Sequence, residues 1–154
     1  MRKKRTDISA PWIELHKAQN LAIQTGYKKG EALSYMVEGG IYQQIAAILV
    51  TEKKYDSAIS NYIQSLLVFE KFRKIEDIVN IKYNSGYIRL KMSQTAAVDK
   101  LFNEALVLSK KNGYLYGEKK ALHYIRVAAL NRSDWRTAEK YILQSLAIDQ
   151  TINY

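Results

Sequence analysis

The feature that most constrains this chain is a segment that recurs twice, each time about forty residues further on. The segment at residues 55–66 contains an alanine, a tyrosine, a serine and a leucine, and the later copies hold small or apolar residues at the same places. The aligned positions are Ala58, Val98 and Ala138; Tyr62, Phe102 and Ile142; Ser65, Ala105 and Ser145; and Leu66, Leu106 and Leu146. A fixed period in the range of 20–50 residues is the signature of stacked repeats, in which each unit buries its apolar face against its neighbours.

The order of residues within this segment predicts a helix that packs closely against another helix. Ala58, Tyr62 and Ser65 lie four and three residues apart, so they share one stripe of a helix. A small residue lets two helices approach, and a bulky residue one turn later fills the groove beside it. The chain also has one proline and no alternating run rich in Val, Ile and Thr. The sequence therefore predicts an all-α fold.

The motifs of these segments resemble the tetratricopeptide repeat. The run Asn84-Ser85-Gly86 is similar to the Asn-Leu-Gly of that family's first helix, and the segment from Thr95 to Leu106 is similar to its second helix. The runs at residues 53–58 and 133–138 resemble the Gly-Asp-Tyr-x-x-Ala turn of the family. The glycine-containing runs at 26–32 and 112–118 resemble the turns of a longer, forty-residue variety that is common in bacterial signalling proteins. The resemblance covers about residues 10–154.

This resemblance implies a right-handed superhelical stack of antiparallel helix hairpins, a TPR-like α-solenoid with about seven helices. We expect a disordered basic tail over residues 1–8 and a single domain over 9–154. Within it we expect a half repeat at 9–27, a repeat with a lengthened first helix at 30–72, and repeats at 74–111 and 115–154. The lengthened helix is expected to begin near Glu31. Asn112-Gly113 predicts a helix C-terminus and Ser133-Asp134 a helix N-terminus.

Composition bounds the classes of function. The net charge is +9, from 24 basic and 15 acidic residues, and it indicates either a well-solvated surface or an acidic partner. Without cysteine there is no disulfide framework and no thiolate site. The basic start at residues 1–5 is not followed by the apolar stretch of a signal peptide, and no run reaches the length of a membrane span. We therefore expect a cytoplasmic protein without membrane contact.

The residues that usually carry chemistry are few and scattered. The two histidines, His16 and His123, are far apart, whereas a metal site needs three or four donors at fixed spacing. Glu76 and Asp77 are adjacent and so diverge around a helix instead of forming a pair for acid–base catalysis. No serine stands at a recognisable spacing from a histidine. The sequence predicts a protein that is not an enzyme and has no cofactor or metal.

A polar and aromatic helical face is the candidate binding site. Its residues recur at spacings of three and four, and in the tetratricopeptide family the first helix of each pair lines the concave groove. The candidate partner-binding residues are Asn80, Tyr83, Asn84, Tyr87, Lys91, Lys120, His123 and Asn131, flanked by Tyr124 and Val127, with Met36, Gln43, Gln44 and Ala47 as the corresponding residues of the first repeat. A tyrosine ring supplies rigid apolar area with a polar tip, and an asparagine pairs with peptide N–H and C=O groups. The alternative interpretation is that Tyr83 or Tyr87 fills the space between neighbouring repeats.

Two functional hypotheses follow. The first is a non-enzymatic module that binds an acidic peptide or protein in its groove, as the sensor or scaffold part of a bacterial regulator. Asn84 and Lys120 match two positions of the family's carboxylate clamp, but Gln43, Ala47 and Tyr124 replace the others. The second hypothesis is a nucleic-acid-binding helical-repeat protein, because aromatic residues interleaved with basic ones suit single strands. The second ranks below the first, because no base-reading pattern recurs from repeat to repeat.

The last helix has apolar residues around most of its circumference. We expect Tyr141, Ile148 and Ile152 to lack a covering partner there. Exposed apolar patches usually mark an interface. The sequence therefore predicts self-association through a terminal helix, most simply as a two-fold homodimer, or a fragment of a longer array.

Overall fold

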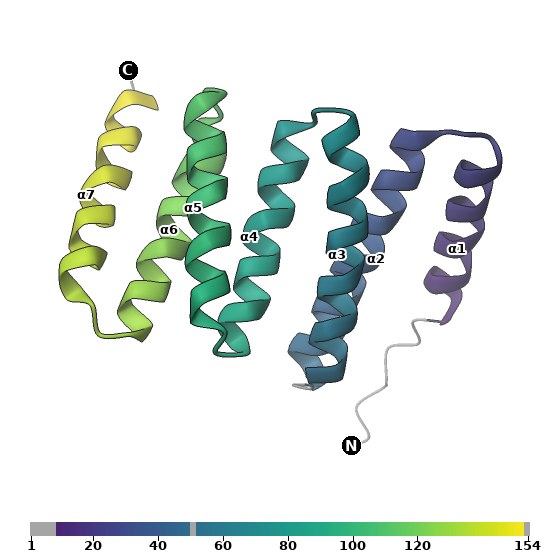
Figure 1. Ribbon diagram of the computed structural model, residues 1–154, viewed down its shortest axis with the longest axis horizontal. Coiled ribbons are helices and arrows are strands. Elements are labelled where there is room, and N and C mark those ends of the chain that lie inside the picture. Colours follow the sequence, from purple (N-terminus) through teal and green to yellow (C-terminus); the bar gives the residue numbers. More distant parts are fainter. Residues whose placement is uncertain (1–8, 50–51, 153–154) are drawn as a thin grey trace. The chain divides into compact units, whose positions relative to one another are not determined.

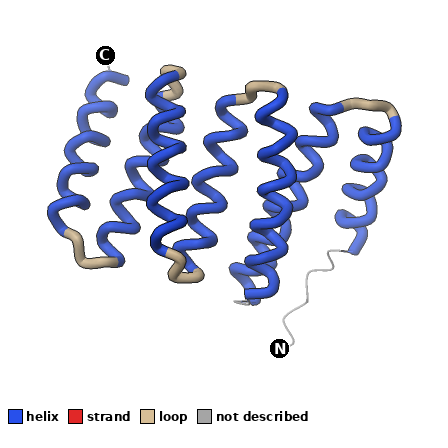
Figure 2. The backbone as a smooth tube through the Cα atoms, in the orientation of Figure 1, coloured by secondary structure: helices blue, strands red, loops and turns tan. Residues whose placement is uncertain are grey.

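The computed structural model of the protein describes residues 9–49 and 52–152, and the side chains of residues 12–41 and 54–151. The described residues form seven α-helices and no strand (Figures 1 and 2). The helices are α1 (Ser9–Gln24), α2 (Lys28–Leu49), α3 (Glu52–Lys71), α4 (Ile75–Lys91), α5 (Thr95–Lys111), α6 (Leu115–Asn131) and α7 (Trp135–Ile152). The prediction of an all-α fold with seven helices is confirmed. The start predicted near Glu31 is three residues late, because α2 begins at Lys28.

The chain divides into two compact units, one spanning Met1–Phe72 and the other Arg73–Tyr154. In the first unit α2 packs against both α1 and α3. In the second unit each helix packs against the next along the chain, and α4 also contacts α6. Each unit thus consists of neighbouring helices that run in opposite directions (Figure 1). The superhelical stacking of all the hairpins into one array stays a prediction.

In two hairpins a glycine of the first helix packs against an aromatic ring of the second. A Cβ atom added to Gly86 of α4 would lie 2.4 Å from a ring carbon of Phe102 on α5. A Cβ atom on Gly39 of α2 would lie 3.0 Å from a ring carbon of Tyr62 on α3. Phe102 and Tyr62 occupy the same place in the repeat, so the aromatic position of the repeat packs on a glycine of the preceding helix. A glycine on the preceding helix thus makes room for the ring, so the two helices can approach closely.

The three connections within the second unit share one backbone conformation. Gly113 has φ 65°, and Ser93 and Ser133 each have φ 58°, in the left-handed region. The next residue then donates its N–H to a carbonyl five residues earlier, as from Tyr114 to Ser109 at 2.9 Å, which is the Schellman arrangement that ends many helices. The prediction of a helix C-terminus at Gly113 is confirmed. At Ser133 the serine closes α6, and the predicted N-cap is Asp134, whose Oδ1 accepts the N–H of Thr137 at 3.1 Å.

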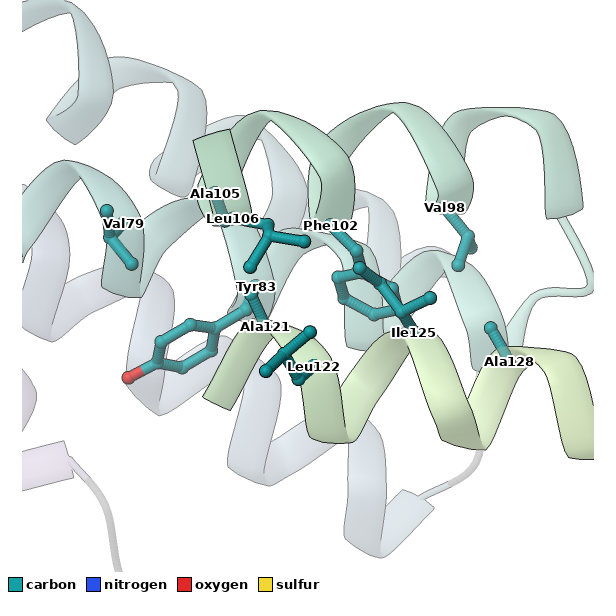
Figure 3. Packing of buried hydrophobic residues seen from close by; sticks show 10 residues of the cluster. All are labelled: Val79, Tyr83, Val98, Phe102, Ala105, Leu106, Ala121, Leu122, Ile125 and Ala128. Carbon is teal, nitrogen blue, oxygen red and sulfur yellow. The ribbon is translucent and has the colours of Figure 1, made fainter. Parts of the chain in front are cut away.

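The core of the second unit lies between α4, α5 and α6. Figure 3 shows its buried cluster, and Phe102 points from α5 into its middle. The ten members of the cluster are Val79, Tyr83, Val98, Phe102, Ala105, Leu106, Ala121, Leu122, Ile125 and Ala128. Helix α7 covers part of this core, because Tyr141 and Ile148 are half-buried against the cluster.

The exposed residues of α7 differ from those that the sequence predicted. Tyr141 and Ile148 have cover from the core, so the predicted lack of cover at these two residues is wrong. The side chain of Ile152 lies outside the described residues. The exposed apolar side chains of α7 are instead Trp135, Ile142, Leu143 and Leu146, with Leu143 62% exposed. Self-association through α7 stays a prediction, and these are the residues available for it.

Candidate partner-binding face

Seven residues of α4 and α6 form what we call the aromatic–lysine face. They are Tyr83, Tyr87 and Lys91 of α4 with Tyr116, Lys120, His123 and Tyr124 of α6. The residues recur at spacings of three and four along each helix, so each helix presents its members on one side. Helices α4 and α6 are in contact although α5 separates them in the sequence. The face therefore joins residues from two successive hairpins.

Tyr124 is the centre of an aromatic group on this face. Its ring stacks on Tyr83, with centroids 5.6 Å apart and planes inclined by 23°. It also stacks on Phe102 at 5.4 Å and 22°, and contacts Tyr87 at 5.8 Å in a tilted geometry. Offset stacked and tilted arrangements are the favourable ones for aromatic pairs. Tyr124 therefore connects the core, through Phe102, to the exposed side of the face.

Two lysines lie over the rings of the face. The Nζ atom of Lys120 is 5.9 Å from the ring centre of Tyr83 and 5.5 Å from that of Tyr116. The Nζ atom of Lys91 is 5.3 Å from the ring centre of Tyr87. At such distances the ring quadrupole attracts the ammonium group. Neither lysine forms an ion pair with a described residue, so both keep a positive charge available to a ligand.

His123 lies at the edge of the face among positive charges. Burial lowers the pKa of this histidine from its ordinary value, and the nearby Arg126 and Lys120 lower it further. Arg126 Nη2 lies 3.0 Å from His123 Nδ1, and the ring of His123 meets that of Tyr124 edge-on at 5.3 Å. Arg126 has donors only, so it donates to Nδ1 and the neutral ring carries its proton on Nε2.

The structure places the predicted residues unequally. Tyr83 is 8% exposed, and its hydroxyl donates to Asn80 Oδ1, so Tyr83 is mainly a core residue and the Asn80 amide is partly engaged. Asn84 and Tyr87 are half-buried, while Lys91 and Asn131 are exposed. The side chains of Asn84 and Asn131 form no hydrogen bond with another described residue.

The structure describes only some of the side chains that the sequence assigned to the groove in the first repeat. In the first repeat Met36 is half-buried, whereas the side chains of Gln43, Gln44 and Ala47 lie outside the described residues. Tyr116 is the member of the face that sequence reasoning missed. Its position four residues before Lys120 was the available signal.

The face presents aromatic rings and ammonium groups side by side, a combination that suits anionic or amphipathic groups. Among the described residues no group of three or more His, Cys, Asp or Glu could hold a metal ion. The described helices include none that is long and apolar enough to cross a membrane. A hollow of about 350 Å³ on α6 is lined by Tyr116, Lys119, Lys120 and His123.

The described residues form an all-helical fold of antiparallel neighbouring helices, with an aromatic and basic surface on α4 and α6. No model of a known protein family matches this chain, and no curated protein matches it significantly.

Proposed function

We propose that this chain is a tetratricopeptide-like binding module and that its aromatic–lysine face binds an acidic peptide segment of a partner protein. The single observation that carries the proposal is the convergence of Tyr87, Tyr124, Lys91 and Lys120 from two hairpins onto one face. The rings supply apolar area, and the two ammonium groups favour carboxylates. In this proposal the module acts as the sensor or scaffold part of a larger regulator, without catalysis.

The lysines are suited to this role because their charge is both available and positioned. Each ammonium lies over a ring, which restricts the flexible side chain before a ligand arrives. Ordering a lysine on binding costs free energy, and a side chain that is already held in place loses less. No carboxylate of the described residues forms an ion pair with Lys120 or Lys91, so a ligand carboxylate does not have to displace one.

Selection from a random peptide library displayed on phage tests the proposal. We expect the chain to enrich peptides that combine an aromatic or aliphatic residue with acidic residues. Calorimetry should then show that the double change Lys91→Gln and Lys120→Gln weakens the binding of these peptides at least tenfold, which is about 1.4 kcal/mol of binding free energy. The change Tyr87→Ala should weaken the same peptides. The control is Lys100→Gln, an exposed lysine of α5 outside the face. Enrichment without acidic residues, or binding that the double lysine change leaves intact, would contradict the proposal.

The same assay separates peptide binding from nucleic-acid binding. If the chain bound single strands through phosphate contacts, the logarithm of the binding constant would fall steeply with the logarithm of the salt concentration. We expect oligonucleotides to bind more weakly than the selected peptides at 0.15 M salt.

Self-association through α7 is a second proposal, favoured by the exposed side chains of Leu143 and Leu146. Sedimentation over a concentration series is the test. We expect association to increase with concentration and to be abolished by Leu143→Glu with Leu146→Glu. A monomer at all concentrations would rule it out.

A further inference from the structure

The hollow on α6 is lined by aromatic and basic residues. Its four lining residues are Tyr116, Lys119, Lys120 and His123, and none of them is acidic. They lie at intervals of three, one and three along α6, so one helix side presents them together. Sequence reasoning assigned Lys120 and His123 to a general peptide face but gave this hollow no role of its own.

The charge around the hollow is only partly neutralised within the chain. Lys119 forms an ion pair with Asp149 of α7. Lys120 instead lies between the rings of Tyr83 and Tyr116, and no described carboxylate pairs with it. A cation over aromatic rings keeps its full charge, because a ring quadrupole attracts the ammonium without neutralising it. The hollow therefore has an uncompensated positive charge held at its wall.

We propose that this hollow is an oxyanion subsite and that its preferred occupant is a phosphate group carried by the partner. The inference rests on the proposed function only for the source of the phosphate, a phosphorylated side chain. A phosphate monoester carries a charge of about −1.5 to −2 at pH 7 and three strong acceptor oxygens. Those oxygens match the donors of Lys120, His123 and the Tyr116 hydroxyl, whereas a carboxylate offers only two oxygens and one charge.

Binding of such an anion is coupled to protonation of His123. On α6 the groups that face this imidazole are Lys120, Arg126 and the ring of Tyr124. On α7 they are Tyr141 and, beyond Lys119, Asp149. In the free chain the two cations favour the neutral ring. A dianion in the hollow favours the imidazolium, so its affinity increases as the pH falls through the range below about 6.5, where a free histidine gains its proton.

The first experiment follows the histidine signals of the whole chain by NMR during addition of sodium sulfate at constant ionic strength. Sulfate stays a dianion over the pH range used, so only the protein titrates. We expect a saturable shift at His123, a rise of about one unit in its pKa, and little change at His16, which lies beside Glu38. Lys120→Gln should abolish the shift, and Lys100→Gln should preserve it.

Three results would overturn the oxyanion subsite. They are the absence of a saturable shift at His123, equal shifts at His123 and His16, and a shift that survives Lys120→Gln. Acetate acting as strongly as sulfate would overturn the preference for a dianion.

The second experiment identifies the source of the phosphate. A short peptide selected on the face is made with a serine, a glutamate or a phosphoserine next to its apolar residue. We expect the phosphoserine form to bind at least about tenfold more tightly than the serine form, as for one charge-assisted hydrogen bond, and more tightly than inorganic phosphate. Equal binding of the three forms, with Tyr87→Ala still harmful, would reject the phosphate inference and leave the proposed function intact. A single-stranded oligonucleotide that displaces sulfate more strongly than the phosphopeptide would reject the peptide source.

Discussion

Replacing Gly86 with alanine tests the close packing of α4 against α5. Gly86 is a buried residue within α4, where alanine adopts the backbone conformation without strain. The added Cβ atom would lie 2.4 Å and 2.8 Å from two ring carbons of Phe102 and 3.1 Å from a third. Phe102 is 0% exposed, and its ring also stacks on Tyr124, so it cannot move without disturbing the core.

Two opposing effects set the size of the change. Alanine in place of glycine favours a helix interior by about 1 kcal/mol. Overpacking a filled core costs about 1–3 kcal/mol, and a contact this short on a fully buried ring lies at the upper end of that range. We therefore expect Gly86→Ala to lower the free energy of unfolding by about 2 kcal/mol.

The measurement is urea unfolding followed by circular dichroism at 222 nm, with Gly40→Ala as the control. Gly40 is also within a helix, but a Cβ atom there would meet only the Tyr62 hydroxyl oxygen at 3.9 Å, an ordinary contact. That variant should gain about 0.5–1 kcal/mol. In a Phe102→Leu background, which removes the ring, the cost of Gly86→Ala should fall by at least about 1 kcal/mol. Equal effects at the two glycines would refute the packing argument.

Three further predictions concern a turn, a helix cap and a half-buried arginine. Gly113→Ala should lower the free energy of unfolding by about 1 kcal/mol in a urea titration, because its φ of 65° is left-handed although the surrounding space is open. Hydrogen bonds from Thr137 lower the pKa of the Asp134 carboxyl group. The ionised Asp134 cap therefore stabilises the fold above the ordinary aspartate pKa, and this stabilisation is lost as the pH falls below about 4. Asp134→Asn should flatten this dependence of the melting temperature on acid pH. Arg126→Met should raise the free energy of unfolding by about 1 kcal/mol, because the buried Nε of Arg126 has no hydrogen-bond partner among the described residues. NMR should also show a higher pKa for His123 in this variant, because burial and, after it, Arg126 lower that pKa in the present chain.

The fold was predictable because its signals are local and repeated. Helical spacing and the scarcity of proline predicted an all-α fold, and the glycine at 113 marked a helix end through its tolerance of a positive φ. The start of α2 was less predictable. A Cβ atom on Gly30 would lie 2.4 Å from the ring of Tyr27, which shows that this ring packs over Gly30. Gly30 therefore lies inside α2, which begins at Lys28. The sequence pattern indicates a turn at Gly30, whereas in the structure this glycine allows close packing within a helix.

The candidate face was predictable as a stripe, but its burial was not. Spacing alone places Tyr83, Tyr87 and Lys91 on one side of α4. It cannot decide how far the neighbouring helix covers each of them, and that depends on Tyr124, which stacks on Tyr83 but only touches Tyr87 at an angle. The depth of each tyrosine in the face is therefore a property of the pair of helices.

The exposed surface of α7 follows from one departure from the repeat. Residue 126 lies forty positions after Gly86, and Ile142 lies forty after Phe102. Where α4 and α5 place a fully buried ring on a glycine, α6 has an arginine, and Arg126 and Ile142 line one small space between α6 and α7. An arginine cannot allow the close approach that a glycine allows. Ile142 consequently stays 38% exposed although its two counterparts are buried. The last hairpin thus leaves partly exposed the position where the repeat pattern predicts burial, and apolar residues of α7 are accessible beside the basic groups of α6.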